Sequence, residues 1–191
     1  KIAMQTFDST LLVFEAASTT SGFVAHEEIA TASGVRILDA SPIGGGRFVI
    51  LASGPSKSLQ AGLTAAHKKL DSDSAIVDQE ILEGVPPAVL ESAFSLTQQK
   101  LEESLVVVDT ESVSGCFAIV QALVEHHGLK AIELKIRRSG VGAHAFLTGP
   151  ATACTLAAEG ARTRLKVAMR TGTVECFEKP SAALRSRFDF V

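Results

Sequence analysis

Short apolar runs alternate with amphipathic segments along the chain, and the whole pattern occurs twice. In the first half it predicts strands over 10–14, 35–40, 47–52 and 75–77, with helices over 22–33 and 55–70. In the second half it predicts strands over 105–108, 129–136, 145–147 and 173–177, with helices over 116–127 and 151–169. Each half therefore follows the order β-α-β-β-α-β. This ferredoxin-like α+β arrangement places helices on one face of an antiparallel sheet.

Three short stretches recur in the same order in the two halves. Ser-Gly-Phe-Val-Ala at 21–25 resembles Ser-Gly-Cys-Phe-Ala at 114–118, Gly-Val at 34–35 resembles Gly-Leu at 128–129, and Leu-Ala-Ser-Gly-Pro at 51–55 resembles Phe-Leu-Thr-Gly-Pro at 146–150. The separations are 93, 94 and 95 residues, a slow drift that small loop insertions produce. The chain is therefore predicted to be a tandem repeat of one domain.

The repeat sets the expected domain boundaries, which are a first domain over 1–84, a linker over 85–98, a second domain over 99–180 and a tail over 181–191. Pro86 and Pro87 stiffen the linker, and a short helix is expected after them. Leu184, Phe188 and Phe190 stand among charged residues in the tail. We expect the tail to pack a short helix against the body of the protein or against a neighbour.

Composition excludes several classes of function. The net charge is −3 with a pI near 6.0, and no basic stripe alternates with aromatic residues, so nucleic acid is not an expected partner. No apolar segment approaches the length of a membrane span, and the polar residues 1–10 lack a signal-peptide core. The three cysteines lie far apart without a metal-ligand spacing, which favours reduced thiols in a cytosolic protein and neither a metal site nor a cofactor.

Each half contains a glycine-rich break between its two central strands. The first is Ile43-Gly44-Gly45-Gly46 and the second is Ser139-Gly140-Val141-Gly142. Taken alone, each is only a hairpin turn. Neither is a nucleotide loop, because no G-x-G-x-x-G opens a helix and no P-loop lysine follows.

With the repeat, these turns resemble the bacterial microcompartment shell domain, whose corresponding turn has the sequence lysine-isoleucine-glycine-serine-glycine. Here Pro42 replaces the lysine and Gly45 the serine, and Lys179-Pro180 matches the basic-proline pair that closes the family's last strand. Gly54-Pro55 and Gly149-Pro150 stand where the family often has glycine-aspartate. The resemblance covers about 10–180 as two fused copies in unpermuted order, most similar to the tandem protein of propanediol-utilising compartments.

The resemblance implies a homotrimer that forms a pseudohexameric tile in the shell of a compartment in the cytoplasm. It also implies other shell proteins and, in some cases, a second stacked trimer as partners. Two features of the family are absent. The lysine that joins neighbouring tiles is replaced by about Thr31 and Glu125, and the cysteine that holds an iron–sulfur cluster in the propanediol type is replaced by Ser41 and Pro42. We therefore expect no such cluster.

A closed ring brings the same loop of every subunit to its axis, and glycine lets backbones approach closely there. We expect a pore for small polar or anionic metabolites lined by Ile43, Gly44, Gly45, Gly46, Ser139, Gly140, Val141 and Gly142. Its mouth would carry positive charge from Arg47, Arg137 and Arg138. This charge argument requires that the three arginines neither point into the subunit nor pair with acids.

No catalytic constellation is visible in the sequence, so we do not expect an enzyme. His126 and His127 fit a helix end, and His26 lies beside acidic residues on a predicted helix. His144 follows the second turn and faces either a lumen or the core. The alternative function is a ferredoxin-like regulatory protein that binds a small effector between subunits, but the sequence shows no polar pocket for one.

Overall fold

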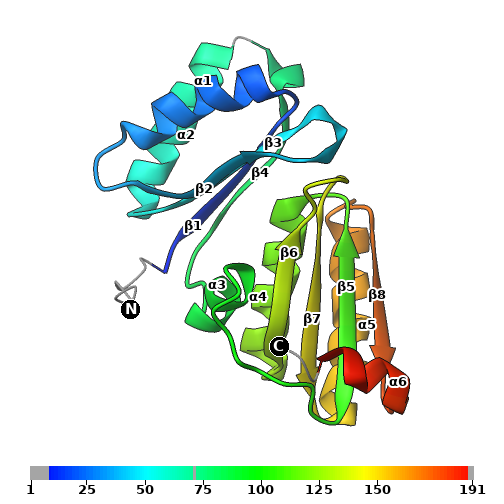
Figure 1. Ribbon diagram of the computed structural model, residues 1–191. Coiled ribbons are helices and arrows are strands. Elements are labelled where there is room, and N and C mark those ends of the chain that lie inside the picture. The colour runs from blue at the N-terminus through cyan, green and yellow to red at the C-terminus, as the bar shows by residue number, and fades with distance from the viewer. Residues whose placement is uncertain (1–8, 71, 189–191) are drawn as a thin grey trace. The chain divides into compact units, whose positions relative to one another are not determined.

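The computed structural model describes residues 9–70 and 72–188 (Figure 1). The described residues form two compact units. The first comprises residues 9–70, 72–87 and 138–141, and the second comprises residues 88–137 and 142–188. Residues 1–8 of the predicted first domain and Phe190 of the predicted tail lie outside the described residues.

The first unit has the element order β1 (Leu11–Ala16), α1 (Thr19–Ala30), β2 (Arg36–Pro42), the 3₁₀ turn η1 (Gly44–Gly46), β3 (Phe48–Ser53), α2 (Ser56–Leu70), η2 (Asp73–Ala75) and β4 (Ile76–Leu82). Its antiparallel strands lie in the order β2-β3-β1-β4. Helices α1 and α2 run along one face of this sheet (Figure 1). Leu12, Phe14 and Ile50 from the sheet pack there with Ile29 and Leu59 from the helices to form the core.

The second unit has the element order α3 (Pro87–Ala93), β5 (Ser104–Thr110), α4 (Val113–His127), β6 (Lys130–Ile136), β7 (Ala143–Gly149), α5 (Ala151–Val167), β8 (Gly172–Phe177), α6 (Ala182–Arg185) and η3 (Ser186–Phe188). Its strands lie in the order β6-β7-β5-β8, which is the order of the first sheet. Figure 1 shows α4 and α5 behind this sheet and α6 in front of it. The predicted α+β class with two ferredoxin-like repeats is confirmed.

The C-terminal segment covers part of the second sheet on the face opposite α4 and α5. Phe188 is 8% exposed and packs with Leu105 and Ile132, and its ring meets that of Phe146 edge-on at 5.3 Å between centroids. The Arg185 guanidinium donates to the carbonyls of residues 102 and 103 at 2.6 Å each. The expectation that the tail packs a short helix against the body is therefore met.

The two units repeat each other in detail. Ser18 caps α1 by accepting from the Ser21 N–H, and Ser112 caps α4 by accepting from the Gly115 N–H, both at 3.1 Å. This offset is 94 residues, so the sequence match of Ser-Gly at 21–22 with Ser-Gly at 114–115 is wrong by one position. The cap at Ser18 also explains why α1 begins at Thr19, earlier than predicted.

The same irregularity interrupts the second strand of each sheet. The register shifts between Ile37 and Asp39 in the first unit and between Ala131 and Glu133 in the second. These positions are again 94 residues apart. A bulge retained at one place in both copies indicates that the strand leading into each glycine turn is bent in the same way.

Candidate functional site

The two glycine turns have the same hydrogen-bonded base. In the first turn the Ile43 N–H donates to the Arg47 carbonyl at 2.9 Å, and in the second the Arg137 N–H donates to the Gly142 carbonyl at 3.0 Å. The second turn encloses one more residue than the first. The two predicted turns are therefore equivalent structures at the same end of their sheets.

A left-handed backbone conformation explains why glycine occupies three positions of the two turns. Gly45 and Gly46 have φ of 72° and 75°, and Gly142 has φ of 76°, a region that other residues adopt only with strain. A Cβ on Gly142 would also lie 1.8 Å from the Thr110 carbonyl oxygen, whereas one on Gly46 would meet no atom within 4 Å. The second turn is thus held tightly against β5, whereas Gly46 at the end of the first turn has open space beside it.

The residues that were predicted to line a pore differ in their exposure to solvent. Gly45, Gly46 and Ser139 are exposed, and Gly44, Gly140 and Val141 are half-exposed. Ile43 is only 5% exposed and Gly142 is buried, so neither presents a surface to solvent. The expected lining accordingly narrows to the six residues with accessible surface.

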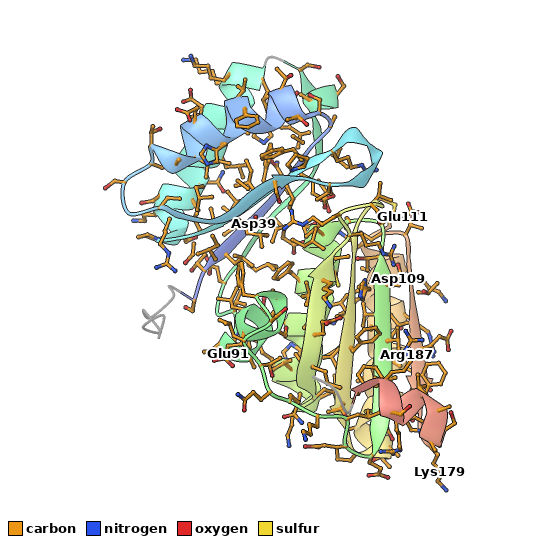
Figure 2. All side chains as sticks on the ribbon, in the orientation of Figure 1. Asp39, Glu91, Asp109, Glu111, Lys179 and Arg187 are labelled. Atoms are coloured by element: carbon orange, nitrogen blue, oxygen red, sulfur yellow. The ribbon has the colours of Figure 1, made fainter. Side chains whose placement is uncertain are left out.

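The arginines at the turn bases pair with carboxylates. The Arg47 guanidinium lies 3.8 Å from the carboxylate of Glu15, whose side chain is fully buried. The Arg137 guanidinium pairs with Asp109, near the carboxyl end of β5 (Figure 2). Arg138 lies in the turn itself, and its guanidinium pairs with the Asp39 carboxylate at 2.8 Å. Positive charge at a pore mouth required arginines without acidic partners, so Arg47, Arg137 and Arg138 do not meet that condition.

The acidic members of these pairs were missed by the sequence analysis. Glu15 and Asp109 are 94 residues apart, each one position before the end of the first strand of its copy. Their arginines come from opposite sides of the turns, since Arg47 follows the first and Arg137 precedes the second. Aligning the two copies strand by strand would have found the shared acid, but its pairing required the folded structure.

Beside the second turn, His144 is a half-buried group with a perturbed pKa. Its Nε2 lies 3.8 Å from the Glu133 carboxylate, and its ring lies 5.3 Å from that of Phe146. Loss of solvent lowers the pKa of His144, although the nearby Glu133 opposes this shift. The neutral imidazole is therefore favoured, and His144 adds little positive charge near the turn.

The remaining candidates form no larger site. His26 lies 3.6 Å from its neighbour Glu27, and His126 and His127 end α4. Burial raises the pKa of the Cys116 thiol to about 12, so this sulfur is not a nucleophile at neutral pH. Within 9–70 and 72–188, no three His, Cys, Asp or Glu side chains are grouped so as to hold a metal ion. No helix in those ranges is long and apolar enough to cross a membrane.

Comparison with known proteins gives a result for the fold. No family model and no curated protein matches the chain. Among solved structures, the chain is similar to a microcompartments protein from Desulfitobacterium hafniense DCB, with a TM-score of 0.81 and 20% identity over 93% of this chain and 98% of that one. The chain has the fold of a microcompartment protein.

A second solved structure supports this assignment of the fold. It is the fused permuted hexameric shell protein MSM0275 from the RMM microcompartment, with a TM-score of 0.60 and 20% identity over 82% of this chain and 81% of that one. A glycine cleavage system transcriptional repressor is also similar, but its TM-score of 0.31 is too low to bear on function.

Proposed function

We propose that the protein is a structural component of a bacterial microcompartment shell and not an enzyme. In this proposal three chains close into a pseudohexameric tile in the cytoplasm, with a central pore for small polar metabolites. The tile contacts other shell proteins in the shell. The unpermuted order of the two copies and their similarity to the propanediol type belong to the same proposal.

One observation carries the proposal. The chain is a tandem repeat with the fold of a microcompartment protein, and both copies keep a glycine turn closed by a backbone hydrogen bond. A ring of three such chains places six equivalent turns around one axis. Exposed backbone at Gly45, Gly46 and Ser139 supplies the polar lining. The domain boundaries proposed above, 1–84 and 99–180, define the repeating body of the tile.

The proposed pore mouth carries less positive charge than the arginines in the sequence alone would suggest. Because Arg47 and Arg137 pair with Glu15 and Asp109, their charges are largely balanced within each chain. We therefore assign the pore to small polar solutes without a requirement for negative charge. Passage would depend on its width and on hydrogen bonds from backbone amides.

The first test is the mass of the purified protein by light scattering coupled to size exclusion. The proposal expects three times the chain mass of 20.0 kDa, or twice that for stacked trimers. A monomer or a dimer would contradict the tile. Electron microscopy at high protein concentration then asks whether the trimers assemble into flat layers or tubes.

Convergence of the turns on an axis can be tested by crosslinking. In a Cys176→Ser background, which leaves only the buried Cys116 and Cys154, Ser139→Cys should give a covalent dimer under mild oxidation. The matched control is Ser33→Cys, at another exposed serine, between α1 and β2. Ser139→Cys should give much more covalent dimer than Ser33→Cys. Equal amounts of dimer from the two variants would show that the turns do not meet.

A further inference from the structure

A hollow of about 330 Å³ lies within the second unit, where the C-terminal half of α5 packs beside the first residues of β8 (Figure 1). This volume is near the lower end of the range of small-molecule sites. Its walls contain three basic side chains and one acidic side chain, Arg162, Lys166, Arg170 and Glu175. All of its lining residues belong to the second unit and none belongs to a glycine turn, so the hollow is no part of the proposed pore lining.

The two arginines of the hollow are held in place, and the lysine is not. The Arg162 guanidinium donates to a backbone carbonyl of β8 at 2.7 Å and lies 3.2 Å from the Glu175 carboxylate. The Arg170 guanidinium donates to the Ser114 hydroxyl at 3.2 Å. The Lys166 ammonium forms no hydrogen bond or ion pair with any residue that the structure describes. The hollow therefore combines two positioned guanidinium groups with an uncommitted positive charge.

The hollow also has an apolar side, and part of it is strained. Leu165 and Val174 are almost fully buried there, whereas the side chain of Met169 is 93% exposed. Met169 has φ of 51°, while α4 of the same unit ends at Gly128 with φ of 65°, the residue that usually takes this conformation. An exposed methionine in a left-handed backbone is strain that the fold does not require, and such strain is often found at binding sites.

The charge of the hollow is specific to the second copy. The prolines before α2 and α5, at 55 and 150, and the last residues of β4 and β8, at 82 and 177, are both 95 residues apart. The loops between helix and strand are therefore equally long, and residues 71–75 correspond to 166–170. Their sequences are Asp-Ser-Asp-Ser-Ala and Lys-Val-Ala-Met-Arg, so two acids in the first copy stand against two bases in the second. Since the same fold accepts either charge, the bases are not needed to form the loop.

We infer that the hollow binds a small organic anion. Its carboxylate or phosphate group accepts charge-assisted hydrogen bonds from Lys166 and from the two guanidinium groups beside it. A short apolar chain on the ligand packs against Leu165 and the exposed Met169. The inference goes beyond the proposed function, because the site lies within one unit of one chain and needs neither a ring nor a pore.

Ligand-observed NMR titration of the wild-type protein with n-butyrate and with n-butyl phosphate tests the site. The two probes have the same apolar chain and differ in the anionic group, so the tighter one shows which group the site takes. Saturable binding of at least one probe is expected. If neither probe binds, the site is overturned. A trimer that binds neither probe would overturn this inference alone, and a monomer that binds one would overturn only the tile.

The variant that tests the charge is Lys166→Glu, and Arg164→Glu is its matched control. Both residues are exposed on α5 and both substitutions change the charge equally, but Arg164 does not line the hollow. Lys166→Glu should bind the tighter probe at least about tenfold more weakly, the effect of losing one charge-assisted hydrogen bond. Arg164→Glu should bind as the wild type does. An equal loss in both variants would mean that the probe follows overall charge, which would refute the site.

Two further variants keep the test decisive. If circular dichroism shows that Lys166→Glu does not fold, Lys166→Ala and Arg164→Ala repeat the comparison with a smaller change. Met169→Gly should keep the midpoint of urea unfolding at or above that of the wild type, because glycine adopts the left-handed conformation freely, yet it should weaken binding. A lower midpoint with unchanged affinity would show that Met169 serves the fold only, and the apolar half of the site would be wrong.

Discussion

Replacing Gly142 by alanine tests how firmly the second turn is fixed to its sheet. The new Cβ would lie 1.8 Å from the Thr110 carbonyl oxygen and 2.7 Å from the Glu111 carbonyl carbon. All of these neighbours are backbone atoms, so no side-chain rotation relieves the overlap. The turn must shift, and the hydrogen bond from the Arg137 N–H to the Gly142 carbonyl is weakened or lost.

The expected cost has three parts. A left-handed alanine costs about 1–2 kcal/mol, the lost hydrogen bond about 0.5–1.5 kcal/mol, and the overpacking about 1–3 kcal/mol. Together they predict a loss of about 2.5–6.5 kcal/mol, a large share of the roughly 5–15 kcal/mol that stabilises a typical domain. Gly128→Ala is the matched control, because Gly128 has φ of 65° in the same unit but a Cβ there meets no atom within 4 Å. It should lose only the backbone part, about 1–2 kcal/mol.

Urea unfolding at one fixed protein concentration measures both variants. Circular dichroism is the appropriate signal, because the chain contains no Trp and no Tyr. Fixed concentration matters because association adds to apparent stability. If Gly142→Ala and Gly128→Ala lose the same free energy, the overlap is relieved without cost, and the conclusion that the turn is rigidly held to β5 is refuted.

Three further predictions concern charge and protonation. Arg47→Ala should lower the free energy of unfolding by about 3 kcal/mol, because the Glu15 carboxylate is fully buried. Arg137→Ala should lower it by less than about 1 kcal/mol, because the Asp109 side chain is 42% exposed. The midpoints of urea unfolding compare the two variants. A thiol reagent at about pH 8 should modify Cys176 before Cys116 and Cys154, whose buried thiols have pKa values raised to about 12 and about 11, and peptide mass spectrometry locates the label. Because burial lowers the pKa of His144 in the folded chain, the unfolded chain takes up the His144 proton at a higher pH than the folded chain does. The free energy of unfolding should therefore fall as the pH drops below about 6.5. His144→Phe should lose less stability over that range, and an unchanged pH dependence would contradict this assignment.

The fold could be predicted because its signals are local and occur twice. Single elements are marked by apolar runs, by Ser18 before the first helix and by glycines between strands. Because the pattern occurs twice, the elements predicted in one copy support those predicted in the other. The ends of an edge strand were predicted less accurately where that strand carries polar residues. Strand β4 extends to Leu82, well past the predicted 75–77, because Asp78, Gln79 and Glu80 pair with β1 despite their polarity.

The candidate site could be predicted only in part. Glycine marks the turns, because only their backbone geometry demands it. The charges around the turns depend on which acid each arginine reaches, and that is set by strand register. Glu15 faces away from the α1–α2 core because its neighbours Phe14 and Ala16 face into it. Arg47 lies close to Glu15 because β1 and β3 pair there, a relation that joins residues far apart in the sequence.

Fusion of two copies into one chain lets the faces of the two sheets differ. A ring of six identical domains must use the same residues at every contact, whereas a ring of three tandem chains makes only three contacts between chains. The residues at those contacts can then change while the equivalent positions of the other copy stay the same. Val49 and Leu51 in the first sheet correspond to His144 and Phe146 in the second, where aromatic and titratable groups replace aliphatic ones.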